Sequence, residues 1–174
     1  MVLAEKKKQE NISEYIIYMY QTELLLRSVD LDFDKVKTGV VDSIPKGSTD
    51  KEELAAWYAD VIAQMHIEGL EKEGHLSYVQ AEVQKLSDLS VQLLGQNDDY
   101  RQVFNAARPA IRESIVSSEG LVNDPIQACI NGVFGLLLSR MNGITVDQQQ
   151  MDKVEHFGNV LSYLSHFYKT MNQA

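Results

Sequence analysis

Hydrophobic positions recur at helical spacing along almost the whole chain, in six or seven blocks, and no segment shows the strict alternation of a half-exposed strand. In the first block, about residues 6–29, Ile12, Ile16 and Met19 share one face with Leu26, and other apolar side chains lie opposite. The connections between blocks are short. The pattern predicts an all-α fold: one domain over residues 1–174, built as a mostly antiparallel bundle of six or seven helices.

Capping signals and glycines divide the rest of the chain. The later blocks are expected at about 34–43, from the capping box at 49–52 to the glycines at 69 and 74, from the capping box at 77–80 to the glycine at 95, after 97–98, at about 125–142, and from the cap at 145–148 to Met171. Pro109 falls inside the fifth block, where a proline is expected to kink or break the helix.

The two final blocks carry the clearest packing signals. Residues 125–142 are apolar on most sides, which predicts the central helix, and Gly132 and Gly135 are expected to let a neighbour approach closely. The last block repeats its apolar residues every three or four positions, as in a bundle seam. This seam either packs internally or is offered to a second subunit.

Charge excludes one class of partner. The 174 residues include 16 Lys and Arg against 25 Asp and Glu, a formal net charge of −9 that repels phosphate backbones. The only basic run is residues 6–8, at a helix start. The acidic balance therefore argues against nucleic-acid binding and is typical of a soluble exterior.

A single cysteine and short apolar runs bear on the compartment. Cys129 has no partner for an intrachain disulfide and is expected to be a small buried hydrophobe. The longest apolar stretch, Val133–Leu138, is far shorter than a membrane span, and no targeting segment is recognised. We expect a cytoplasmic protein that does not enter a membrane.

The motifs of common catalytic and cofactor sites are absent. No acidic residue stands three positions before any of the four histidines, no two histidines are four positions apart, and no phosphate-binding glycine loop or nucleophile elbow occurs. The sequence therefore predicts no metal, no cofactor and no assignable catalytic residue. It favours a non-enzymatic protein and leaves open an enzyme whose site has no recognised motif.

One acidic residue stands among apolar neighbours. Glu23 lies at the centre of the first block's apolar arc, and Arg27 follows one turn later. The two form either an ion pair that fixes packing or a polar anchor in a ligand pocket. His75, after Gly74 at a helix corner, either binds local backbone groups or water, or acts as an acid–base group without an assignable partner. The candidate ligand-binding residues are Tyr15, Tyr20, Glu23, Arg27, Trp57 and His75.

The first block also carries a fairly specific pattern. Its residues are Glu10-Asn11-Ile12, Glu14-Tyr15, Tyr18-Met19, Gln21, Glu23 and Arg27, joined further on by Trp57-Tyr58 and Gly74-His75-Leu76. Together they resemble a family of all-helical proteins from Bacteroidetes that is defined as a domain of unknown function, over nearly the whole chain. The resemblance implies a one-domain helical protein of cytoplasmic type and carries over no catalytic role.

Two functions fit these observations. The first is a non-enzymatic interaction module, whose partner is a second copy of the chain or another protein, because the first block is apolar on two sides and the last is rich in aromatic residues. The second is a small-ligand-binding bundle with a pocket near Glu23, Arg27 and Trp57.

Overall fold

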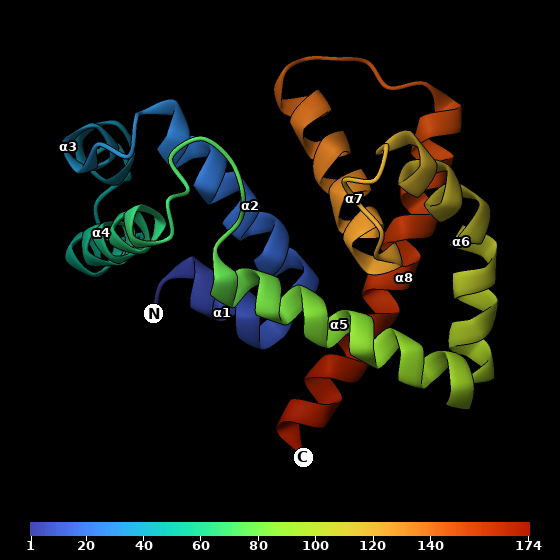
Figure 1. Ribbon diagram of the computed structural model, residues 1–174. Helices are drawn as coiled ribbons and strands as arrows, with labels where there is room; N and C mark the ends of the chain where they lie inside the picture. Colours follow the sequence, from blue (N-terminus) through green and yellow to red (C-terminus); the bar gives the residue numbers. More distant parts are fainter.

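A computed structural model describes all residues from 1 to 174 as eight α-helices and one π-helical turn, with no strand (Figure 1). The predicted all-helical fold is confirmed. The elements are α1 (Leu3–Glu10), α2 (Ile12–Ser28), α3 (Phe33–Val36), the π-turn (Lys37–Val41), α4 (Lys51–Ile67), α5 (Ser77–Gln96), α6 (Asp98–Ser117), α7 (Pro125–Met141) and α8 (Gln148–Gln173). None of these helices combines the length and hydropathy that a membrane span requires.

The helix count exceeds the predicted six or seven because the first block is two helices. Asn11 has extended backbone angles, φ −154° and ψ 102°, so it separates α1 from α2. Its side chain accepts a hydrogen bond from the Glu14 amide and thereby caps α2. Helical periodicity continues across this single residue, which is why the sequence pattern does not reveal the break.

Pro109 lies inside α6, and the helix continues past it to Ser117. The break that the sequence allowed is therefore not observed. The carbonyl of Asn105 loses its usual amide donor to the proline. Both Asn105 and Pro109 are exposed. Water can therefore bind the Asn105 carbonyl in place of the missing amide, and α6 tolerates the proline.

Most helices begin near the short polar side chains that predict them, but the capping box predicted at 49–52 does not form, because Asp50 rather than Thr49 caps α4. Asp50, Asn97, Asp124 and Asp147 each accept hydrogen bonds from the first amides of α4, α6, α7 and α8. The start of α5 is different: its flanking residue Leu76 has no side-chain cap. The predicted capping box at 77–80 is wrong, because carboxylates from two other helices bind the first amides of α5.

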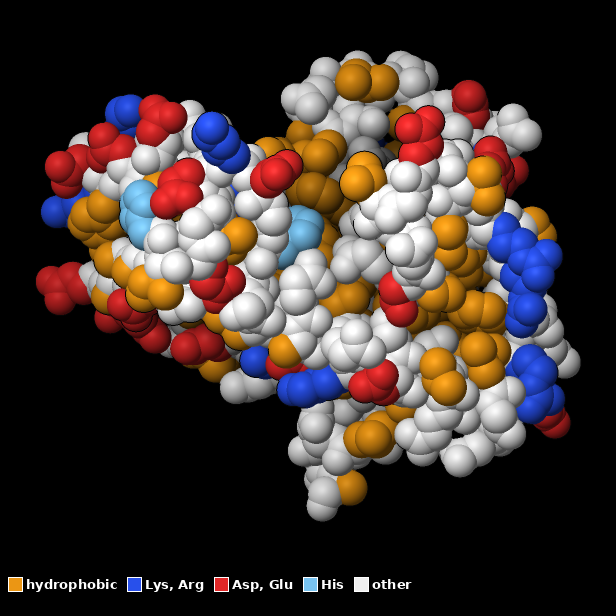
Figure 2. Space-filling view, viewed as in Figure 1, with side chains coloured by type: hydrophobic (Ala, Val, Ile, Leu, Met, Phe, Trp, Pro, Cys, Tyr) orange, Lys and Arg blue, Asp and Glu red, His pale blue; other side chains and the backbone are white.

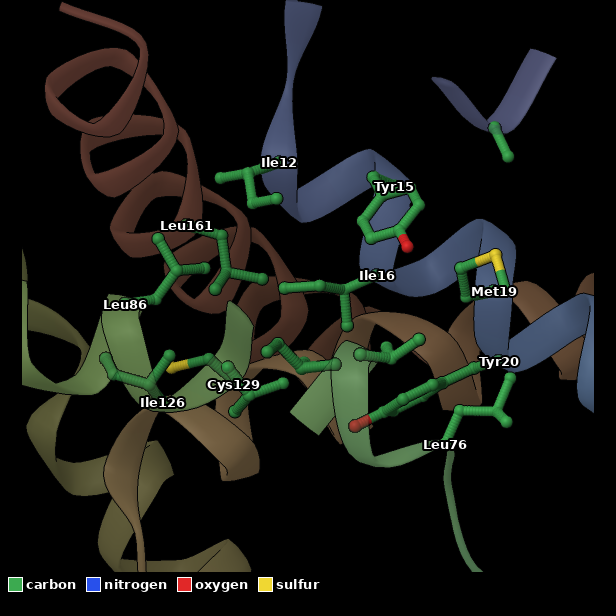
Figure 3. Close-up of a cluster of buried hydrophobic side chains, with 14 of the residues drawn as sticks. Ile12, Tyr15, Ile16, Met19, Tyr20, Leu76, Leu86, Ile126, Cys129 and Leu161 are labelled. Carbon is green, nitrogen blue, oxygen red and sulfur yellow. The ribbon is translucent and has the colours of Figure 1, made fainter. Parts of the chain in front are cut away.

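A single cluster of 35 buried hydrophobic residues forms the core. Figure 3 shows where four helices meet in it, with side chains from α2, α5, α7 and α8: Ile12, Ile16, Leu86, Ile126 and Leu161. Cys129 is buried in this cluster, as predicted. Burial raises the pKa of its thiol to about 12, with a further contribution from Asp124, so it stays protonated at neutral pH.

The predicted central position of α7 is only half correct. Its buried residues, Ile126, Ala128, Cys129 and Ile130, all lie in its first half, whereas α2 has nine buried residues. A Cβ at Gly132 would come within 2.4 Å of the Phe157 ring, which confirms the predicted close approach there. No neighbour lies within 4 Å of the same point at Gly135, so that expectation is wrong.

The second half of α7 stays uncovered because α6 and α8 diverge from it. A cleft of about 550 Å³ lies between these three helices, and Gly135, Leu136 and Ser139 of α7 line it. The apolar side chains beyond Gly132 are consequently half-exposed rather than buried. In contrast, the middle of the α8 seam is internal, with Phe157, Leu161 and Leu164 buried.

Glu82 links three helices. This α5 carboxylate is buried and accepts a hydrogen bond from the Tyr168 hydroxyl of α8 at 2.6 Å. Lys8 of α1 and Lys85 each lie 3.2 Å from its other oxygen. Burial alone would raise the pKa of Glu82, but hydrogen bonds from Tyr168, Lys85 and Lys8 outweigh it and hold the pKa below its usual value of 4.5.

We expect the variant Glu82→Gln to have a free energy of unfolding about 1–3 kcal/mol lower than that of the wild type at pH 7. The reason is that two lysines lose their charged partner. A lowered pKa means that the ionised group stabilises the fold above pH 4.5, and that this contribution is lost as the pH falls through the lowered value. Urea denaturation at pH 7 and at acid pH measures both effects. A gap between wild type and variant that does not shrink in acid would contradict this account, and the exposed Glu155→Gln serves as control.

Candidate functional site

The structure divides the six candidate residues into two neighbouring groups. Four of them, Tyr20, Glu23, Arg27 and His75, form a polar cluster where α2 meets the loop between α4 and α5, which we call the Glu23 cluster. The other two, Tyr15 and Trp57, line a cleft between α1, α2, α4 and α5, which we call the aromatic cleft. None of the five main clefts is lined by a residue of the Glu23 cluster.

Glu23 is completely buried, at 0% exposure. One carboxylate oxygen accepts the Leu76 amide at 2.9 Å, and the other lies 2.6 Å from Nδ1 of His75. Leu76 immediately precedes α5, so the carboxylate lies at the positive end of that helix. The acid that the sequence places in an apolar arc is therefore a cap supplied from another helix.

Arg27 binds the same loop but not Glu23. Its Nε donates to the Leu70 carbonyl at 2.9 Å, and an Nη donates to the Gly74 carbonyl. The ion pair expected between Glu23 and Arg27 is absent, so that prediction is wrong. The loop has both an amide and carbonyls without backbone partners. The Glu23 carboxylate accepts from the amide, and the Arg27 guanidinium donates to the carbonyls.

His75 connects this cluster to α7. Its ring stacks on Tyr20, with centroids 3.6 Å apart and planes 10° from parallel. The Tyr20 hydroxyl in turn accepts from Gln80 of α5 at 2.9 Å and from Gln127 of α7 at 3.1 Å. The acidic partner that the sequence could not assign to His75 is thus Glu23, 52 residues away along the chain.

A carboxylate that orients an imidazole is also the geometry of a general base. The His75 side chain is 31% exposed, and its Nε2 makes no hydrogen bond. However, His75 lines none of the main clefts, and no hydroxyl or thiol forms a hydrogen bond with it. The arrangement therefore holds the helix start in place.

Glu68 is a functional partner of this loop that sequence reasoning missed. Its carboxylate accepts the Ser77 amide at 2.8 Å, the Ser77 hydroxyl at 2.7 Å and the Gln64 side-chain amide at 2.8 Å. The Ser77 hydroxyl and then Gln64 lower the pKa of Glu68, since they stabilise its charged form. In the sequence, Glu68 resembles an ordinary exposed acid at the end of a helix. Only its position four residues after Gln64 indicated a side-chain hydrogen bond.

The aromatic cleft has a volume of about 460 Å³, within the range of small-molecule sites. Three aromatic side chains line it, namely Tyr15 of α2, Trp57 of α4 and Tyr78 of α5. Two carboxylates, Glu5 and Asp60, also border it. Tyr78 and the two acids were not among the sequence candidates, because each lies in a stretch that reads as an exposed helix surface.

The polar ends of these aromatic side chains lack protein partners. Tyr15 is only 5% exposed, yet its hydroxyl makes no hydrogen bond, and neither do the Tyr78 hydroxyl and the Trp57 indole nitrogen. Since no fully buried polar atom of the protein lacks a partner, the Tyr15 hydroxyl must keep contact with solvent, and the cleft is the one main cleft that Tyr15 lines. In Figure 3 this hydroxyl points away from Ile12. Burial, then Glu82 and Glu23, raise the pKa of Tyr15 to about 12, so it remains a neutral hydroxyl.

Lys8 lies at the inner edge of the cleft. Its Nζ is 5.3 Å from the centroid of the Tyr15 ring and 3.2 Å from the Glu82 carboxylate. Lys8 shares the Glu82 carboxylate with Lys85. Neither Glu5 nor Asp60 forms an ion pair.

Comparison with known proteins identifies a family and adds no activity. A family model described as Domain of unknown function (DUF4924) matches residues 1–174. No curated protein and no solved structure matches the chain.

The Glu23 cluster generates a stability prediction. We expect Glu23→Gln to lower the free energy of unfolding by about 1–3 kcal/mol, because the Leu76 amide and His75 lose a charged acceptor in a fully buried position. The matched control on the same helix is the exposed Glu14→Gln, whose surface pair with Lys7 is worth less than about 1 kcal/mol. Urea unfolding followed by circular dichroism measures both, and equal stability of the two variants would refute the role assigned to Glu23.

Proposed function

We propose that this chain, which belongs to the Domain of unknown function (DUF4924) family, is a non-enzymatic interaction module that self-associates through the uncovered half of α7. The observation that carries this proposal is the run of half-exposed or exposed apolar side chains after Gly132. It continues to Met141, the last residue of the helix and 64% exposed, and beyond it to Ile144, 58% exposed. The other members of this apolar face are Val133, Phe134, Leu136, Leu137 and Leu138.

Exposed apolar side chains that occur singly need no explanation, but a contiguous set marks an interaction surface. Figure 2 shows hydrophobic side chains gathered in the hollow between the lobe of α2 and α4 and the lobe of α6 and α7. On the α2 side, Gln21 contacts the sulfur of Met141, and Leu24 is exposed. The apolar face of α7 therefore borders a second, partly apolar helix surface.

The charge distribution favours a second copy of the chain as the partner. Residues 125–139 contain no Asp, Glu, Lys or Arg, in a chain whose formal net charge is −9. Two copies repel each other over most of their surfaces but can meet at α7, where Arg140 is the only charged residue of the helix. A twofold pair of these helices would pack one apolar face against its own copy, the commonest form of homodimer.

We expect the wild-type protein to dimerise as its concentration rises, and Met141→Glu to remain monomeric with an unchanged melting temperature. A buried, unpaired glutamate at the interface opposes association, while the exposed position costs the fold little. Sedimentation or light scattering over a concentration series measures both. Val91→Glu, at a similarly exposed apolar residue on α5, is the matched control and should dimerise normally. A wild-type protein that is monomeric throughout the series would refute self-association.

Small-ligand binding is a second candidate function, and a different observation favours it. The aromatic cleft contains three polar aromatic groups that have no partner within the protein. Its position differs from the pocket expected around Glu23, Arg27 and Trp57, because only Trp57 reaches it. The cleft and the apolar face of α7 share no residue, so one chain can have both functions.

A further inference from the structure

We infer that the aromatic cleft binds a small organic cation, of the class of alkylated ammonium compounds. This inference rests on the ligand-binding candidate and does not depend on self-association. It begins from the joint presence of three aromatic rings and two carboxylates around a space of about 460 Å³. Rings with nearby acids are the surroundings in which proteins hold alkylated ammonium groups.

The Tyr15 hydroxyl points to a ligand more directly than the shape of the cleft. The two most deeply buried tyrosines have protein partners for their hydroxyls: Gln80 and Gln127 bind Tyr20, and Ser90 binds Tyr100 at 2.6 Å. The Tyr58 hydroxyl, also in a buried side chain, interacts with Tyr18. Tyr15 is also more than nine-tenths buried, but its hydroxyl faces the cleft without a partner. A hydroxyl in this position is satisfied by water or by a hydrogen-bonding group on a bound ligand, such as the hydroxyl of choline.

The charges around the cleft select a cation. Lys8 already holds an ammonium group 5.3 Å from the Tyr15 ring, and it shares the Glu82 carboxylate with Lys85. The charged lining residues are the carboxylates of Glu5 and Asp60 and the ammonium of Lys8, so the lining as a whole is negative. Burial and the negative charges of Glu23, Glu68 and Asp60, together with Tyr15, raise the pKa of Tyr78, which agrees with a negative potential at this place.

The same surroundings argue for an alkylated cation. A metal ion would need several grouped ligands, and no group of three or more His, Cys, Asp or Glu side chains exists in the protein. A primary ammonium needs hydrogen-bond acceptors on three sides. The lining includes Tyr15, Met19 and Trp57, whose apolar surfaces can pack against alkyl groups and whose aromatic rings can face a cationic centre.

Trp57 is the only tryptophan of the chain and lines the cleft, so its fluorescence reports occupancy. The full chain is titrated with choline and with 3,3-dimethyl-1-butanol, a neutral compound of the same shape, at constant ionic strength. We expect a saturable change with choline and an affinity at least about tenfold lower for the neutral compound. No saturable change, or equal affinity for both compounds, would overturn the inference.

Two variants locate the binding. Asp60→Asn and Tyr78→Ala change exposed side chains and should each weaken choline binding about three- to tenfold. The matched control is Asp99→Asn, an exposed and unpaired carboxylate on α6, which should bind choline like the wild type. Unchanged affinity in both cleft variants would place the binding elsewhere and reject the site.

The two proposals fail separately. Met141→Glu alters the apolar face of α7 and no residue of the cleft, so it should leave the choline titration unchanged. A protein that dimerises but shows no saturable titration excludes the cation site and leaves self-association standing. A protein that stays monomeric but binds choline excludes self-association and leaves the cation site standing.

Discussion

The buried carboxylate of Glu23 is the interaction on which the arrangement of the N-terminal half depends. A carboxylate at 0% exposure is unfavourable unless hydrogen bonds replace its lost water. Here the Leu76 amide and His75 provide them, and both belong to the loop that leads into α5. Because the amide needs an acceptor as much as the carboxylate needs donors, each group fixes the other. The start of α5 is therefore determined by α2 rather than by its own first residues.

The position of α5 in turn places side chains at both ends of the aromatic cleft. Tyr78 lies in the first turn of α5 and lines the cleft, while Glu82, one turn later, holds Lys8 beside Tyr15. The apolar face of α7 lies on the other lobe, toward the upper end of that helix in Figure 1. An acid-lined cleft and an uncharged helix face thus occupy separate parts of one acidic molecule.

Periodicity and capping residues were sufficient to predict most helices, because both are local. The acids at 50, 124 and 147 cap the helices they precede, and the small residue Gly132 faces Phe157 as expected. The break at Asn11 escaped prediction, since the apolar period runs through it. The exposure of the second half of α7 also escaped, because a pattern records which side chains are apolar but not whether a neighbour covers them.

The sequence predicted only some residues of the candidate site, namely those on α2 together with Trp57 and His75. An acid in an apolar arc signals that Glu23 must have a partner, but nothing local reveals that the partner lies 52 residues away. Arg27 was the nearest opposite charge in sequence, and the loop carbonyls of Leu70 and Gly74 proved the better acceptors in space. Lys8, Asp60 and Tyr78 read as solvated surface, and only the packing of α1, α4 and α5 around Tyr15 brings them to the cleft.

Native-state hydrogen exchange of the Leu76 amide tests the central role of Glu23 most directly. If the carboxylate anchors the start of α5, this amide exchanges only through large-scale unfolding, and its opening free energy approaches that of the whole protein. Exchange as fast as that of the exposed loop residues Glu71, Lys72 and Glu73 would contradict the account, because it would show that the helix start opens without the rest of the fold.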